Sequence, residues 1–74
     1  MADAGTPDLL DRQVRHDLII QKTPRQLAGL FQWWTARQID PRLVRWVRQQ
    51  IIFEMSATHG YEAAAEFLRA LLGQ

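Results

Sequence analysis

The sequence contains no cysteine among its 74 residues. This absence excludes disulfide bridges, thiolate zinc sites and cysteine nucleophiles. The four glycines are isolated from one another, so no glycine-rich loop is present to cradle phosphate groups. No apolar run approaches the ~20 residues that a membrane-spanning helix needs. The stabilising elements available to this chain are therefore apolar packing, helix capping and contact with a partner.

Length sets a further limit, because 74 residues form one domain at most. A chain of this size buries only ~60% of its unfolded surface, so its core is marginal without a partner chain. The hydrophobic content of 47% is typical of a globular protein. Residues 1–5 are small and acidic, unlike a secretory signal. We expect a flexible N-terminus over residues 1–5, a single helical domain over residues 6–74, and a cytoplasmic location.

Three helix-start signals of one kind occur along the chain. Thr6–Pro7, Thr23–Pro24 and Asp40–Pro41 each place an N-capping residue before a proline at the first helical position. Gln26 can complete a capping box with Thr23, and Gly60 can end a helix by adopting a positive φ. The sequence predicts helices over about 7–20, 24–38, 41–57 and 61–72, and no strand. The expected fold class is all-α, a small bundle of four short helices.

Each predicted helix has apolar residues at helical spacing that we expect to face inward. These residues are Leu10, Val14 and Leu18; Leu27, Leu30, Phe31 and Trp34; Leu43, Val44, Val47, Ile51 and Met55; and Tyr61, Ala64, Phe67, Leu68, Leu71 and Leu72. Six large apolar side chains fall outside these faces: Leu9, Ile20, Trp33, Trp46, Ile52 and Phe53. Because a monomer rarely exposes so much apolar surface, we expect a homodimer. The alternative is a central third helix that buries Trp46 and Phe53.

Charge is distributed unevenly along the chain. Residues 12–48 carry a net charge of +6, whereas residues 1–11 carry −3 and residues 49–74 carry −2. Most of the basic residues are arginines, which suit bidentate contacts with phosphate or carboxylate groups. This asymmetry favours an acidic partner. The alternative is that the arginines form an ordinary solvated helix face.

Part of the chain is similar to a helix-turn-helix unit. Residues 23–28 resemble its opening helix, and residues 40–48 resemble a recognition helix with its own N-cap. However, the helical pattern of the opening helix continues through residues 32–38, about two turns too far for that motif. We therefore do not assign the chain to the helix-turn-helix family.

Residues suited to catalysis are scarce. His16 and Asp17 are adjacent on a helix and point about 100° apart, so they cannot orient one another. His59, Glu62 and Glu66 could share one helix face and hold a metal. Acidic side chains near a helix N-terminus are equally explained by helix electrostatics. We expect no catalytic residue, no cofactor, no bound metal and no small-molecule substrate.

The sequence therefore favours a small, non-enzymatic regulatory protein of bacterial or phage type. The leading interpretation is that it acts on nucleic acid or on a nucleic-acid-handling complex. The residues predicted to contact phosphate or acidic groups are Arg37, Arg42, Arg45, Arg48 and Gln49, and the predicted interface anchors are Trp33, Trp46, Ile52 and Phe53. The alternative is a protein–protein inhibitor or adaptor that captures its partner on the exposed tryptophan and phenylalanine side chains.

Overall fold

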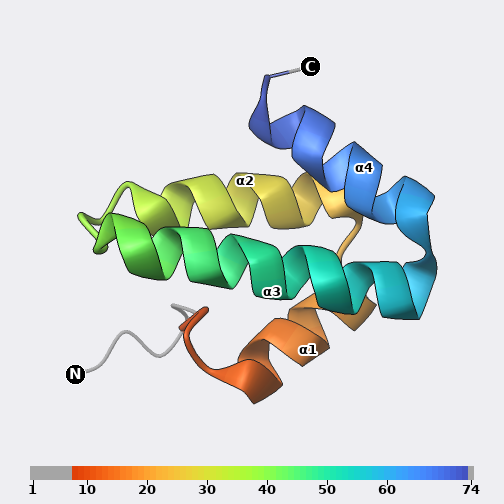
Figure 1. The fold of residues 1–74 in the computed structure, drawn as a ribbon, viewed down its shortest axis with the longest axis horizontal. Coiled ribbons are helices and arrows are strands. Elements are labelled where there is room, and N and C mark those ends of the chain that lie inside the picture. The colour runs from red at the N-terminus through yellow and green to blue at the C-terminus, as the bar shows by residue number, and fades with distance from the viewer. Residues whose placement is uncertain (1–7, 74) are drawn as a thin grey trace.

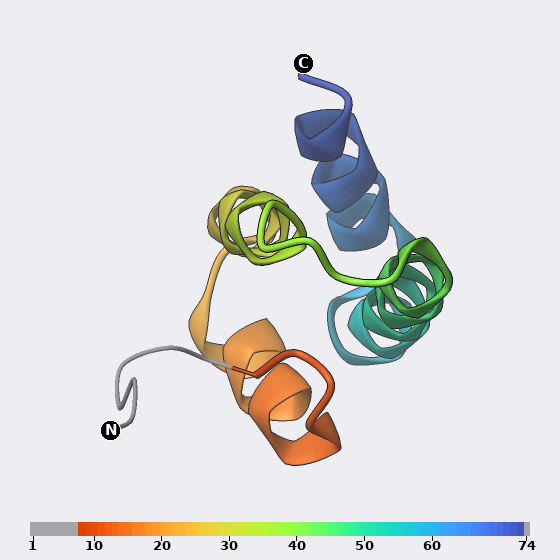
Figure 2. The same cartoon turned by 90° about the vertical axis from the view of Figure 1, so that its left-hand side faces the viewer.

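The computed structural model of the protein describes residues 8–73. Its described part contains no strand and four helices, α1 (Arg12–Gln21), α2 (Pro24–Thr35), α3 (Pro41–His59) and α4 (Tyr61–Leu71). Figure 1 shows α2 and α3 running antiparallel along the long axis of the molecule, with α1 and α4 on opposite sides of them. The view along this pair in Figure 2 shows the same arrangement. The predicted all-α fold of four helices is confirmed.

Local capping interactions set the starts of α2 and α3. Thr23 Oγ1 accepts a hydrogen bond from the Gln26 amide at 3.1 Å, and Gln26 Oε1 accepts one from the Thr23 amide at 3.0 Å. Asp40 Oδ1 accepts a hydrogen bond from the Arg42 amide at 2.9 Å. Each cap satisfies an amide that has no partner within its helix. Gly60, with a φ of 98°, separates α3 from α4 as predicted.

The first helix differs from the prediction because a different residue caps it. It begins at Arg12 instead of residue 7, and the Asp11 carboxylate accepts hydrogen bonds from the amides of Gln13 and Val14. The preceding residues form a turn in which the Asp11 amide donates to the Asp8 carbonyl at 3.0 Å. The predicted cap at Thr6–Pro7 and the predicted flexible residues 1–5 lie outside the described residues.

This later start changes which side chains of the first segment are buried. Leu9, which was predicted to lie off the apolar face, is fully buried by the turn, while Leu10 is exposed. On α1 itself the buried residues are Arg15 and Ile19. Val14 and Leu18 are half-buried on the flank of that face. The predicted inward position is therefore wrong for Leu10, whereas Leu18 packs against the core as predicted.

The other helix ends differ less. α2 ends at Thr35 instead of residue 38, and Gln38 adopts a positive φ of 63° that a continuing α-helix does not allow. α3 runs to His59, two residues further than predicted, and stops at Gly60. α4 ends at Leu71, one residue short of the prediction.

Apolar side chains from all four helices and the preceding turn form the core. Its fully or almost fully buried members are Leu9, Ile19, Leu27, Ala28, Phe31, Trp34, Val47, Ile51, Met55 and Phe67. The ring of Phe31 lies 6.1 Å from that of Trp34 and 6.0 Å from that of Phe67, measured between centroids. Burial of one such side chain stabilises the fold by roughly 1.5–3 kcal/mol. The aromatic cluster thus fixes α4 against α2.

Besides Leu10, four residues predicted to face inward are exposed instead. Tyr61 and Leu68 lie on α4, Leu72 lies directly after it, and Leu43 lies on α3. The buried residues of α4 are Ala64 and Phe67. Leu68 follows Phe67 by one residue and so points about 100° away around the helix. The packed face of α4 is narrower than its apolar pattern indicated.

Within the described range, no helix has both the length and the apolar character needed to cross a membrane.

Candidate functional site

One side of α3 faces away from the core and carries most of the predicted site residues. At about 100° per residue, Val47, Ile51 and Met55 lie on the buried side. The opposite side is formed by Arg42, Arg45, Trp46, Gln49, Phe53 and Ser56, and we call it the outward face of α3. Trp46 is 47% exposed and Phe53 is 77% exposed. The alternative in which α3 buries both aromatic side chains is wrong.

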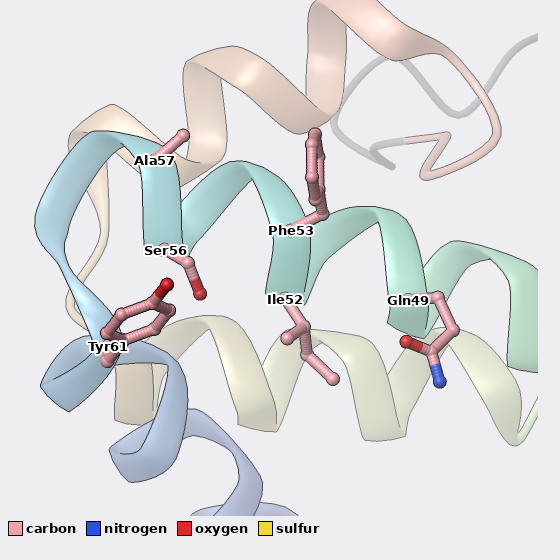
Figure 3. Close-up of a pocket in the computed structure, with 6 residues that line it drawn as sticks. All are labelled: Gln49, Ile52, Phe53, Ser56, Ala57 and Tyr61. Atoms are coloured by element: carbon pink, nitrogen blue, oxygen red, sulfur yellow. The ribbon is translucent and has the colours of Figure 1, made fainter.

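Phe53 forms a ridge between two shallow grooves. The α3–α4 groove, of about 390 Å³, is lined by Gln49, Ile52, Phe53, Ser56, Ala57 and Tyr61. Figure 3 shows Phe53 pointing to the α1 side of α3, whereas Ile52 points to the opposite side. Phe53 also lines the second groove, the α1–α3 groove, which has a volume of about 520 Å³. A protruding ring with an indentation on each side is a shape that a complementary surface can enclose.

A buried arginine lines the α1–α3 groove. Arg15 is only 3% exposed, and its guanidinium lies 5.1 Å from the centroid of the Trp46 ring. Its Nη1 donates to the carbonyl oxygens of Leu9 at 2.9 Å and Leu10 at 3.0 Å. These bonds tie the turn before α1 to that helix. The stacking contact supports one face of the Trp46 indole while leaving nearly half of the side chain exposed.

The guanidinium of Arg15 is incompletely satisfied. Its Nε is buried and has no hydrogen-bond acceptor among the described residues. An unsatisfied buried donor costs about 1–3 kcal/mol. Arg15 Nε is the one buried side-chain nitrogen or oxygen atom within residues 8–73 that lacks a hydrogen-bond partner, which calls for a structural or functional explanation.

Two histidines connect α1 with α3. His16 Nδ1 lies 2.5 Å from Glu54 Oε2 at the edge of the α1–α3 groove. His59 Nε2 lies 2.9 Å from the carbonyl oxygen of Ile19. Both rings therefore have structural partners. No set of three histidine, aspartate or glutamate side chains in residues 8–73 is arranged to hold a metal.

The arginines predicted to bind an acidic partner do not form one cluster. Arg42 Nη2 lies 3.6 Å from Asp40 Oδ2, within the same helix start. Arg45 is exposed on the outward face. Arg48 lies about 120° around the helix from Arg42 and is half-buried. Only part of the predicted basic strip therefore shares the outward face.

A second aromatic cluster lies on α2. The guanidinium of Arg37, just after the helix, lies 5.0 Å from the centroid of the Trp33 ring. Trp33 is exposed, as its off-face position predicted. Ile52, by contrast, is half-buried and packs against the core. The structure thus places Arg42, Arg45, Trp46, Gln49 and Phe53 on one face of α3, whereas Trp33 lies on α2 and Arg37 just after it.

Several residues that line the two grooves were not predicted as site residues, and Arg15 and Tyr61 are two of them. Arg15 lies one helical turn before Ile19, a spacing that places it on the buried face once Asp11 is recognised as the N-cap. Tyr61 was predicted to be part of the core, yet it is 85% exposed and lines the α3–α4 groove. No local signal separates an exposed first-turn tyrosine from a buried one, because the packing of α4 decides the outcome.

No family model, curated protein or solved structure matches the chain.

Proposed function

We propose that the protein is a non-enzymatic binding protein that captures a partner protein on the outward face of α3. The observation that carries this proposal is the position of Phe53, exposed between two grooves. Tryptophan, tyrosine and arginine are enriched among the residues that dominate the energy of protein interfaces. Tyr61 and Trp46 each line one of the two grooves beside Phe53, and Arg45 lies further along the outward face of α3. The proposed role is that of an inhibitor or adaptor.

The arrangement of the arginines supports a protein partner over nucleic acid. Binding to a nucleic-acid backbone draws its affinity from several free cations that contact phosphates together. Here Arg42 has the Asp40 carboxylate beside it, and Arg48 is half-buried on a different flank. An apolar ridge with a few flanking charges is instead the usual composition of a protein interface centre.

Affinity capture from a nuclease-treated lysate of the native host tests the proposal. The wild-type protein should retain a partner that the Phe53→Ser variant loses. Leu72→Ser is a matched control, because Leu72 is 78% exposed but lies at the end of α4, outside both grooves. A partner that binds Phe53→Ser as well as wild type would contradict the proposal.

Nucleic acid is the second candidate, favoured by the exposed Arg45 next to Trp46 on the outward face. A base could stack on the indole while the arginines contact phosphates, with stacking contributing ~1–3 kcal/mol. Fluorescence anisotropy with DNA and RNA at ~50 mM salt tests this candidate. Arg42→Ala and Arg45→Ala should each reduce the slope of log affinity against log salt by about 1, because each removes one cation that binds phosphate. Absence of binding at that salt concentration removes this candidate.

We also propose that the protein forms a homodimer in the absence of its partner. This proposal rests on the large apolar side chains that are exposed in a chain with a small core, because monomers rarely expose much apolar surface. A second copy and the partner protein would then compete for the outward face of α3.

A further inference from the structure

Arg15 occupies the centre of the buried face of α1, where an apolar residue is normally found. Only 3% of the residue is exposed. Burying a cation is unfavourable unless an anion or a full set of hydrogen bonds compensates it. Arg15 has two carbonyl acceptors, both on Nη1, and one aromatic ring. No carboxylate of the described residues forms an ion pair with it.

The α1–α3 groove contains a second cation, the guanidinium of Arg12, in addition to Arg15. Arg12 and His16 line the groove with Arg15, and Arg12 is exposed. The only carboxylate among the described lining residues is that of Glu54, which the His16 ring already contacts. The groove therefore has an excess of positive charge around its α1 wall.

The remaining lining of the groove is largely apolar, with Leu10, Trp46, Phe53 and Ala57 beside the polar side chains of Gln50 and Thr58. Leu10 and Phe53 are both exposed there, and the Trp46 indole stands against Arg15. Phe53 belongs to both the groove and the outward face of α3, so the two surfaces are continuous. A ligand that suits these walls combines one negative charge with an adjoining apolar group.

We propose that the α1–α3 groove binds a carboxylate of the partner protein, an aspartate or glutamate side chain flanked by an apolar residue. This inference rests on the proposed function, because the partner is the protein captured on the outward face of α3. Arg12 contacts the carboxylate and Arg15 supplies positive charge behind it, while Phe53 and Leu10 pack against the apolar neighbour. Arginine is suited to this role because its fork of donors matches carboxylate geometry. A dianionic phosphate is less suited, because it would approach Glu54.

Phenylacetate is a probe that carries this chemistry without the partner, and phenylacetamide is its neutral counterpart. Titration of the ¹⁵N-labelled protein should give saturable shifts of the Trp46 indole N–H and the Arg15 Nε–H. We expect millimolar affinity for phenylacetate and at least tenfold weaker binding of phenylacetamide. Equal affinity for both probes, no saturable shift of either signal, or tighter binding of inorganic phosphate would overturn the proposal.

Two matched arginine variants test whether phenylacetate binds in the α1–α3 groove. Arg12→Gln should weaken phenylacetate binding at least threefold, and its exposed position leaves the fold intact. Arg25→Gln is the control, because Arg25 is also exposed but lies on α2, beside Glu66 and Arg69. Unchanged binding in Arg12→Gln, or an equally weakened affinity in Arg25→Gln, would overturn the assignment to this groove.

The probe separates this inference from the proposed function. Failure of phenylacetate to bind rejects the carboxylate site and leaves capture on Phe53 untouched. Retention of the partner by Phe53→Ser rejects the proposed function whatever phenylacetate does. If both the carboxylate site and the proposed function are correct, Arg12→Gln should also weaken capture of the partner protein at least threefold. The affinity of the wild type for the partner should then fall more steeply with salt than the affinity of Arg12→Gln.

Discussion

The two faces of α3 carry large apolar side chains in opposite environments. Val47, Ile51 and Met55 are at most 1% exposed, whereas Trp46 and Phe53 on the other face are 47% and 77% exposed. The inner face belongs to the core, whereas the outward face also carries arginine and glutamine side chains of α3, and its Trp46 contacts Arg15 of α1. Apolar content alone therefore does not distinguish residues that fold this protein from residues available for binding.

Because the two faces differ in burial, truncating a side chain to alanine should destabilise the fold on the buried face of α3 but not on the outward face. Ile51→Ala removes part of a side chain that the core encloses, so it should lower the free energy of unfolding by about 2–5 kcal/mol. Phe53→Ala removes a larger side chain from the surface and should change stability by less than about 0.5 kcal/mol. Urea denaturation of both variants measures the difference. Equal destabilisation would mean that Phe53 is part of the folding core.

Sequence signals that act over a few residues predicted the structure well. The caps at Thr23 and Asp40 and the break at Gly60 each depend on residues within one helical turn, and all three are confirmed. The exposed positions of Trp33, Trp46 and Phe53 followed from helical spacing once those boundaries were known. The start of α1 was wrong because two capping signals compete near it, and the Asp11 side chain caps the helix that forms.

Structural features that depend on tertiary packing could not be predicted from the sequence. The apolar pattern of α4 is wide enough to bury either Phe67 or Tyr61, and contact with Phe31 of α2 selects Phe67. Likewise, nothing local indicates that Arg15 stacks on Trp46, because these residues are far apart in the sequence. The grooves on either side of Phe53 exist only when α1 and α4 are in place.

Self-association tests whether the outward face of α3 is a binding surface. The wild type should dimerise at micromolar concentration, and Phe53→Asp should weaken the dimer at least tenfold, or ~1.4 kcal/mol, because it places a charge in the interface centre. Leu72→Asp is the control on a distant exposed site. Sedimentation equilibrium measures both. A wild-type mass of 8.6 kDa at all concentrations would contradict the homodimer and leave the face to another partner.

Loss of a helix cap should have a smaller effect on stability, and this effect does not depend on either face of α3. Thr23→Ala and Asp40→Ala each leave an amide without its side-chain acceptor and should cost ~1 kcal/mol. For a chain of this size that corresponds to a fall of ~4–8 °C in Tm. Thr58→Ala is the control, because Thr58 is an exposed residue within α3 and caps no helix. A Tm that falls equally in Thr58→Ala would mean that the destabilisation does not report capping.

The contact between His16 and Glu54 should have the smallest effect, since it lies at the border between the inner and outer faces. Its side chains are 47% and 25% exposed, so solvent screens their interaction. A double-mutant cycle with His16→Gln and Glu54→Gln should give a coupling energy of about 0.2–1 kcal/mol that decreases with added salt. The burial of Leu9 and Ile19 would then account for most of the attachment of α1 to the rest of the fold. A salt-insensitive coupling well above ~1 kcal/mol would instead show that this contact holds α1 in place. In that case the α1–α3 groove, which depends on the position of α1, would be stabilised by polar rather than apolar contacts.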